Sequence, residues 1–125
     1  MKKIKLFKVM AVIAMCLGFI HITVTPLIVF SMKGLGHKSQ LVFTYMFTFT
    51  GVGILFIGWV QYYILRKWNN DEKLLTILKV SVFVVIISGI GAVATMWNNP
   101  FAYIILFLAL YEIILLKNLA TNSTN

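Results

Sequence analysis

Four long apolar runs constrain the fold of this chain more than any other feature. They cover residues 9–30, 41–65, 74–97 and 100–116, with lengths of 22, 25, 24 and 17 residues. A helix of about 20 residues crosses the ~30 Å hydrocarbon core of a bilayer and satisfies its own backbone hydrogen bonds there. The chain is 61% apolar and only 11% charged, which fits the same class. The sequence therefore predicts an all-α membrane protein with four transmembrane helices.

Short polar connections at 31–40, 66–73 and 98–99 set the predicted topology. Short links make consecutive helices antiparallel neighbours. We therefore expect a single integral membrane domain over residues 1–125, folded as an up-down-up-down four-helix bundle. The halves 1–65 and 66–125 share neither matched Gly and Pro breaks nor matched polar positions, which argues against an inverted-repeat transporter.

The positions of the basic residues predict the orientation. Nine Lys and Arg residues lie near the two ends of the chain and the second connection, whereas only Lys33 and Lys38 lie on the opposite side. By the positive-inside tendency, both termini are expected in the cytoplasm, with the chain in the plasma membrane. A formal charge of +8 confined to the ends of apolar runs suits anionic lipid headgroups and not nucleic acid. The short Lys-rich start and the absence of eukaryotic sorting signals favour a bacterial source.

The single cysteine, Cys16, excludes one class of enzyme. Without a second cysteine the chain makes no intramolecular disulfide, so a quinone-linked thiol oxidoreductase is excluded. Lipidation of Cys16 is disfavoured because Met15 stands where a lipoprotein signal needs a small residue. The first apolar run has no Ala-x-Ala-like exit, and so predicts an uncleaved first span.

Small and polar residues recur at helical spacing in every run. In lipid, helices associate through close packing of small residues and through hydrogen bonds. These stripes are therefore expected to face one another in the bundle interior. They comprise Ala14, Gly18, His21 and Thr25; Thr44, Thr48, Gly51, Leu55, Gly58 and Tyr62; Ser81, Val85, Ser88, Ala92 and Thr95; and Ala102, Ile105, Ala109 and Glu112.

His21 is expected near the middle of the first span, where an ionisable group needs a partner. Thr48 and Ser88 lie at similar depth on the second and third helices. With Thr25, these residues form the candidate ligand-binding set. Two interpretations stay open: a satisfied core histidine, or a functional group that accepts a proton, binds a ligand or ligates haem. Haem would need a second copy of His21 at a dimer interface, because the other histidine, His37, falls in a loop.

Glu112 is the only acidic residue within a span. It is expected roughly 10 Å closer to the cytoplasm than His21, so no direct pair between them is predicted. Gln61, Tyr62 and Ser81 are the expected hydrogen-bonding neighbours of this buried carboxyl. Lys79 shares its depth but lies opposite the polar stripe of its helix, where snorkelling is expected. A structural lock and a functional carboxyl both remain open.

The sequence contains no pattern typical of an enzyme. It has no nucleophile–base set, no metal-ligand spacing, no phosphate-binding glycine loop and no paired carboxylates. This argues against an enzyme without excluding one, and no metal is expected. Small multidrug exporters carry an essential carboxylate in the first helix, which is absent here. Dual-topology fluoride channels lack the charge bias found in this chain.

Three short motifs resemble those of small uncharacterised bacterial four-helix integral membrane proteins. The first span contains Gly18-x-x-His21 followed by Thr25-Pro26, the second contains Thr50-Gly51-Val52-Gly53, and the fourth opens with Asn99-Pro100. The resemblance covers about a dozen residues and the general layout. It implies an α-helical bundle and no particular activity.

Two hypotheses of function follow from the sequence. The first is non-enzymatic binding or transport of a small apolar or weakly basic ligand within the bundle, oriented by His21, Thr25, Thr48 and Ser88. The second is an accessory or immunity-type protein that docks a partner membrane protein or a pore-forming peptide through lipid-facing surfaces. The expected partners are therefore the lipid bilayer and either a small ligand or a membrane protein, with a homo-oligomer compatible with both hypotheses.

Overall fold

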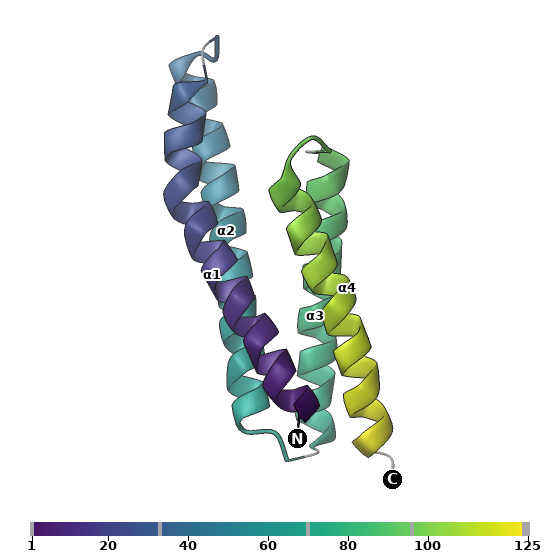
Figure 1. Ribbon diagram of the computed structural model, residues 1–125. Helices are drawn as coiled ribbons and strands as arrows, with labels where there is room; N and C mark the ends of the chain where they lie inside the picture. Colours follow the sequence, from purple (N-terminus) through teal and green to yellow (C-terminus); the bar gives the residue numbers. More distant parts are fainter. Residues whose placement is uncertain (1, 33, 70, 96, 124–125) are drawn as a thin grey trace.

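The computed structural model is all-α in the part of the chain that it describes, residues 2–32, 34–69, 71–95 and 97–123 (Figure 1). This confirms the predicted fold class. The side chains of residues 2, 95 and 121–123 are not described, so Lys33 and the Thr95 side chain lie outside the described part. The four helices are α1 (Lys2–Ser31), α2 (His37–Arg66), α3 (Glu72–Thr95) and α4 (Pro100–Ser123).

The helices extend beyond most of the predicted apolar runs, because polar flanking residues continue them. The fourth helix differs most from its predicted run, since it continues past residue 116 to Ser123. The part of this helix that is long and apolar enough to cross a membrane is therefore Pro100–Ala120. All four helices are long and apolar enough to cross a membrane. Pro26 lies within α1, which continues through it.

Local side-chain caps start the helices of the second half. The Oδ1 atom of Asp71 accepts a hydrogen bond from the backbone N–H of Lys73 at 2.8 Å, at the beginning of α3. The Oδ1 atom of Asn99 accepts one from the N–H of Phe101 at 3.0 Å, and Pro100 occupies the first position of α4. Such caps satisfy the free N–H groups of a first turn, and proline is favoured at that first position. The polar connections thus specify where α3 and α4 begin.

The helices form two antiparallel hairpins, α1–α2 and α3–α4, as the short connections predict (Figure 1). The hairpins pack against each other through α1 with α4 and α2 with α3, while α2 and α4 make no close backbone contact among the described residues. Both hairpin connections lie at one end, and the termini lie at the other end with the α2–α3 connection. Figure 1 shows that the hairpins converge at the end that holds the termini and diverge toward their connections.

Glycines bring the backbones of α1 and α2 close together. A Cβ atom placed on Gly18 would lie 2.6 Å from the backbone nitrogen of Leu55 and 2.7 Å from the carbonyl oxygen of Gly51. One on Gly58 would lie 2.7 Å from the carbonyl oxygen of Ala11. Close approach of this kind is how small residues stabilise helix pairs in membranes. The first hairpin is therefore closely packed along much of its length.

The predicted stripes coincide with the buried faces of the helices. Buried members occur on every helix, and the other described members are half-buried. The buried ones are Ala14, Gly18 and Thr25; Gly51 and Gly58; Ser81 and Val85; and Ala102, Ile105, Ala109 and Glu112.

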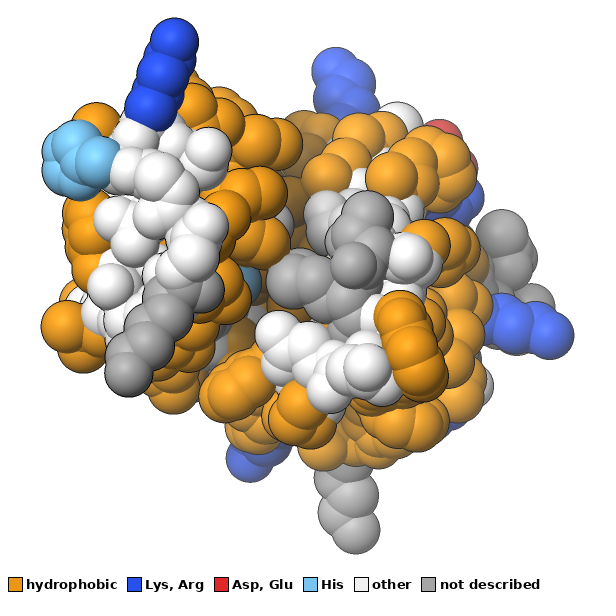
Figure 2. Space-filling view, turned by 90° about the horizontal axis from the view of Figure 1, so that it is seen from above, with side chains coloured by type: hydrophobic (Ala, Val, Ile, Leu, Met, Phe, Trp, Pro, Cys, Tyr) orange, Lys and Arg blue, Asp and Glu red, His pale blue; other side chains and the backbone are white. Residues whose placement is uncertain are grey.

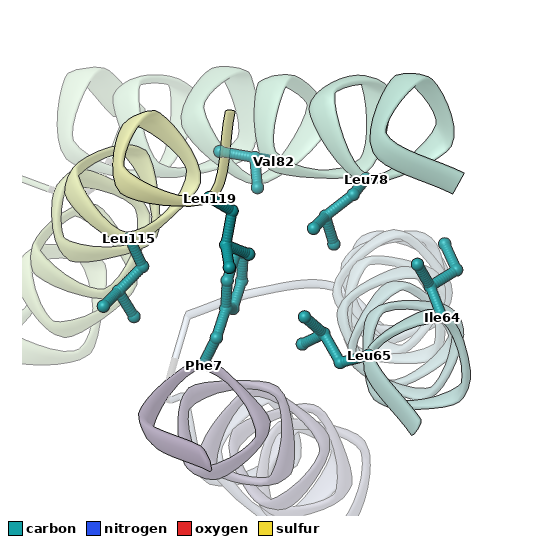
Figure 3. Close-up of a cluster of buried hydrophobic side chains, with 7 residues drawn as sticks. All are labelled: Phe7, Ile64, Leu65, Leu78, Val82, Leu115 and Leu119. Carbon is teal, nitrogen blue, oxygen red and sulfur yellow. The ribbon is translucent and has the colours of Figure 1, made fainter. Parts of the chain in front are cut away.

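Two apolar clusters form the core. The first lies near the termini and draws side chains from all four helices (Figure 3): Phe7, Ile64, Leu65, Leu78, Val82, Leu115 and Leu119. The second lies toward the hairpin connections: Ala14, Ile54, Val85, Ile105, Leu108 and Ala109. No member of either cluster extends the core to the far ends of the hairpins, which is where they diverge. The space between the hairpins there is the setting of the candidate site.

Candidate functional site: a cleft between the hairpins

A cleft of about 140 Å³ lies between the diverging ends of the hairpins. A dry apolar cavity of about 150 Å³ accommodates a molecule the size of benzene. Seen from the end of the hairpin connections, hydrophobic side chains border the hollow between the two hairpins (Figure 2). The lining includes the polar residues His21, Thr25 and Asn99. The apolar lining residues are Leu17, Ile20, Val24, Ile28, Val29, Met32, Phe47, Phe101 and Ile105.

His21 lies in this cleft without a full set of hydrogen bonds. Its Nε2 atom is buried and has no hydrogen-bonding partner among the described residues. The imidazole interacts with the backbone of Phe47 and packs edge-on against the Phe47 ring, with the ring centroids 6.1 Å apart and an interplanar angle of 73°. A buried polar atom without a partner is uncommon and costly. The side chain therefore presents an unsatisfied polar atom beside an apolar cleft.

The structure places the four predicted ligand-binding residues in different surroundings. His21 and Thr25 both line the cleft, whereas Thr48 and Ser88 do not. Thr48 lines a second, more open hollow beside α2, together with Thr44. The hydroxyl oxygens of both threonines are buried and have no described partner, so Thr48 makes no hydrogen bond to His21. Ser88 is half-buried on α3 and lines neither hollow.

Most of the residues that line the cleft could not be assigned to a site from the sequence, and Phe47, Asn99 and Phe101 are among them. Phe47 lies one position before the predicted Thr48 and has no polar group to draw attention to it. Asn99 was assigned only to the connection before α4, where it caps the helix. The signal that could have identified Asn99 and Phe101 is their position at the start of α4, which lies opposite the C-terminal end of α1.

The Thr23 hydroxyl donates hydrogen bonds to backbone carbonyl oxygens of its own helix, α1. It donates to the carbonyl oxygens of Phe19 at 3.1 Å and Ile20 at 3.0 Å. It therefore does not bond the carbonyl of Ile22, which loses its usual backbone donor because Pro26 has no N–H. Thr23 is exposed and is not among the residues that line the cleft.

Glu112 and Gln61 form a second polar site, deeper in the bundle. The Nε2 atom of Gln61 donates a hydrogen bond to Oε2 of Glu112 at 2.9 Å, as their predicted shared depth indicated. The other expected neighbours do not bond this carboxyl: Tyr62 is half-buried, and the Ser81 hydroxyl donates to the carbonyl oxygen of Leu78 at 2.8 Å. The His21 side chain lies in the cleft and not beside Glu112, consistent with the depth argument.

Lys79 is exposed on α3, and no ion pair with Glu112 is formed within the described part of the chain. We therefore expect Lys79→Gln to change the free energy of unfolding by no more than about 0.5 kcal/mol, as is usual for surface positions. Reversible unfolding of the two proteins in mixed micelles measures this difference. A clear destabilisation would instead mean that Lys79 supports Glu112.

The fold and the two polar sites define a small multi-pass membrane protein built as a four-helix bundle. Comparison of the chain with protein-family models, curated proteins and solved structures finds no match. Among the described residues, no group of three or more His, Cys, Asp or Glu side chains could hold a metal ion. The polar side chains that line the cleft belong to His21, Thr25 and Asn99, and the rest of its lining is apolar.

Proposed function

We propose that this protein binds a small apolar or weakly basic molecule in the cleft between its hairpins, with His21 as the polar contact. The observation that carries this proposal is the buried, unpartnered Nε2 atom of His21 beside an otherwise largely apolar lining. A mostly apolar pocket with a few placed polar groups is typical of small-molecule sites. A ligand that hydrogen-bonds to Nε2 would remove the cost of leaving this nitrogen unsatisfied.

The cleft lies at the hairpin-connection end of the bundle, which bears on where a ligand would enter. The bias of nine basic residues against two supports an orientation with both termini in the cytoplasm. In that orientation the cleft faces the outer half of the membrane. The ligand would therefore enter from the outer leaflet or the outer face, and transport would require a further opening toward the cytoplasmic end.

Native mass spectrometry of protein released gently from its own membrane is the first test. A stoichiometric non-lipid mass is expected on the wild-type protein. A bare chain, or a chain that carries only lipid, would contradict the proposal. An absorption band typical of haem that vanishes in His21→Ala would identify the bound group as haem at a dimer interface instead.

Replacement of His21 is expected to weaken the binding of the ligand in the cleft. We expect His21→Ala to lower its affinity about tenfold, which corresponds to the ~1.4 kcal/mol of one hydrogen bond. The matched control is His37→Ala, because His37 is exposed at the start of α2 and outside the cleft lining. The bound fraction of each variant is measured by native mass spectrometry at equal protein concentration. Equal loss in both variants would contradict a specific role for His21.

The docking hypothesis predicts the opposite pattern of sensitivity. Phe83 on α3 and Phe107 on α4 lie on outward faces of the bundle, and their exposed fractions are 59% and 69%. If polar substitutions there abolish activity in cells while His21→Ala does not, the ligand-binding proposal fails and an accessory or immunity-type role replaces it.

A further inference from the structure

A buried acid–amide pair occupies the centre of the bundle, between the two apolar clusters. Glu112 of α4 and Gln61 of α2 are both 0% exposed. On α4, Glu112 lies between Ala109 of one cluster and Leu115 of the other. Because α2 and α4 are diagonal neighbours without close backbone contact, the hydrogen bond between these side chains links the two hairpins through the middle of the bundle.

The pair has more acceptors than donors. Gln61 gives one N–H to Oε2 of Glu112, but Oε1 of Gln61 and Oε1 of Glu112 are both buried without a described partner. Leaving two such oxygens unsatisfied in an apolar interior is costly. What the site lacks is therefore a hydrogen-bond donor.

No described cation supplies that donor. Each helix carries titratable groups toward this level, but none forms an ion pair or hydrogen bond with Glu112, whose described polar partner is Gln61. Arg66, Lys79 and Lys117 are exposed, and Lys8 and Tyr62 are half-buried. These titratable side chains are Lys8 on α1, Tyr62 and Arg66 on α2, Lys79 on α3, and Tyr111 and Lys117 on α4.

We propose that Glu112 and Gln61 form a proton-binding site, in which Glu112 carries a proton and shares it with Gln61. The carboxylic O–H donates to Oε1 of Gln61, while Nε2–H of Gln61 donates to the other carboxyl oxygen. One proton thus satisfies both orphaned oxygens and removes the charge from the bundle interior. A metal cation fits less well, because Ca²⁺ or Mg²⁺ takes about six or more oxygen ligands.

The proton also governs how the hairpins pack. When the proton leaves, a charge with one hydrogen bond remains in an apolar interior, which is strongly unfavourable. The deprotonated bundle would relieve this by admitting water between α2 and α4. Proton binding at Glu112 therefore favours close packing of the two hairpins around this pair. This inference does not depend on a ligand in the cleft.

The chain offers a simple spectroscopic test, because its only other glutamate, Glu72, is exposed. In Glu72→Gln protein labelled with ¹³C at the side-chain carboxyl of glutamate, Glu112 gives the only glutamate carboxyl signal. We expect the chemical shift of a protonated acid in bilayers at neutral pH. The matched control, Glu112→Gln, keeps Glu72 and should give the shift of a carboxylate. A carboxylate shift for Glu112 at neutral pH would overturn the proposal.

A second measurement tests the partner of the proton. The infrared C=O stretch of the protonated acid should be present in the wild-type protein and should move to higher frequency in Gln61→Leu, because that change removes the hydrogen bonds. The control is the Tyr62→Phe variant, which keeps Gln61 and should leave the frequency of this band unchanged. A band that does not respond to Gln61→Leu would show that the proton is not shared with Gln61.

Discussion

Replacement of Gly18 by leucine is expected to separate α1 from α2 and to lower the free energy of unfolding by about 3 kcal/mol or more. The added Cβ atom alone would lie 2.6 Å from the Leu55 nitrogen and 2.7 Å from the Gly51 carbonyl oxygen. Both of these are backbone atoms, so the clash is not relieved by a change of side-chain rotamer. The two helices must move apart, and the contacts along their seam weaken with them.

A leucine at Gly51 tests the same seam from the other side. There the nearest atom to a new Cβ is Cγ1 of Ile22 at 2.8 Å, which a rotamer change can move, and the Gly18 carbonyl oxygen follows at 3.0 Å. We therefore expect a smaller loss than for Gly18, within the ~1–3 kcal/mol typical of overpacking. Unfolding in mixed micelles, with far-UV circular dichroism as the signal, measures both losses.

Gly53 provides the matched control, because a Cβ placed there meets nothing within 4 Å. It lies two positions from Gly51 on the same helix, so Gly53→Leu makes the same change in helix propensity and hydrophobicity. We expect this variant to be close to the wild type in stability. If Gly53→Leu destabilised the protein as much as Gly51→Leu, close packing of α1 against α2 would not be the reason for the loss.

The faces of the helices could be predicted from the sequence because lipid leaves few ways to pair helices. Small and polar residues at helical spacing indicated the seams, and Gly18, Gly51 and Ala109 are indeed buried in them. The depth of Gln61 and Glu112 followed from the rise of a helix, and the two side chains do meet. Periodicity therefore predicted the buried faces, and depth predicted the level of the central polar pair, while the short connections predicted the topology.

The cleft could not be predicted from the same information. Periodicity gives the direction in which a face points but not the distance to the opposite face. That distance depends on how the hairpins diverge, and the divergence puts Phe47 and Phe101 in the lining with His21. It also separates Thr48 and Ser88 from the cleft, although both had been placed at the depth of His21. Two of the four residues predicted to bind a ligand, His21 and Thr25, therefore line the cleft, and the other two do not.

Both candidate sites lie where the two hairpins face each other. The cleft opens where the hairpins diverge, and the Glu112–Gln61 pair lies between the two apolar clusters that join the hairpins. A change in the angle between the hairpins would alter both places at once. The hydrogen bond between Gln61 and Glu112 is therefore expected to influence the shape of the cleft. Its contribution to the free energy of unfolding can be measured separately.

Gln61→Leu is expected to lower the free energy of unfolding by about 2 kcal/mol, because it leaves the Glu112 carboxyl buried without its hydrogen bonds. The double variant Gln61→Leu with Glu112→Leu should recover most of this loss and lie within about 1 kcal/mol of the wild type. Replacing both members of a buried polar pair with apolar groups removes the desolvation cost together with the hydrogen bonds.

The single variant Glu112→Gln distinguishes a protonated Glu112 from an ionised one. An amide at this position accepts from Gln61 and donates back to its Oε1 atom, as the protonated acid does. If Glu112 carries a proton, this variant should match the wild type in stability at neutral pH. If Glu112 is a carboxylate, removing the buried charge should make Glu112→Gln clearly more stable than the wild type. Unfolding of the four proteins in parallel therefore measures the strength of the pair and checks its protonation independently of the spectroscopic signals.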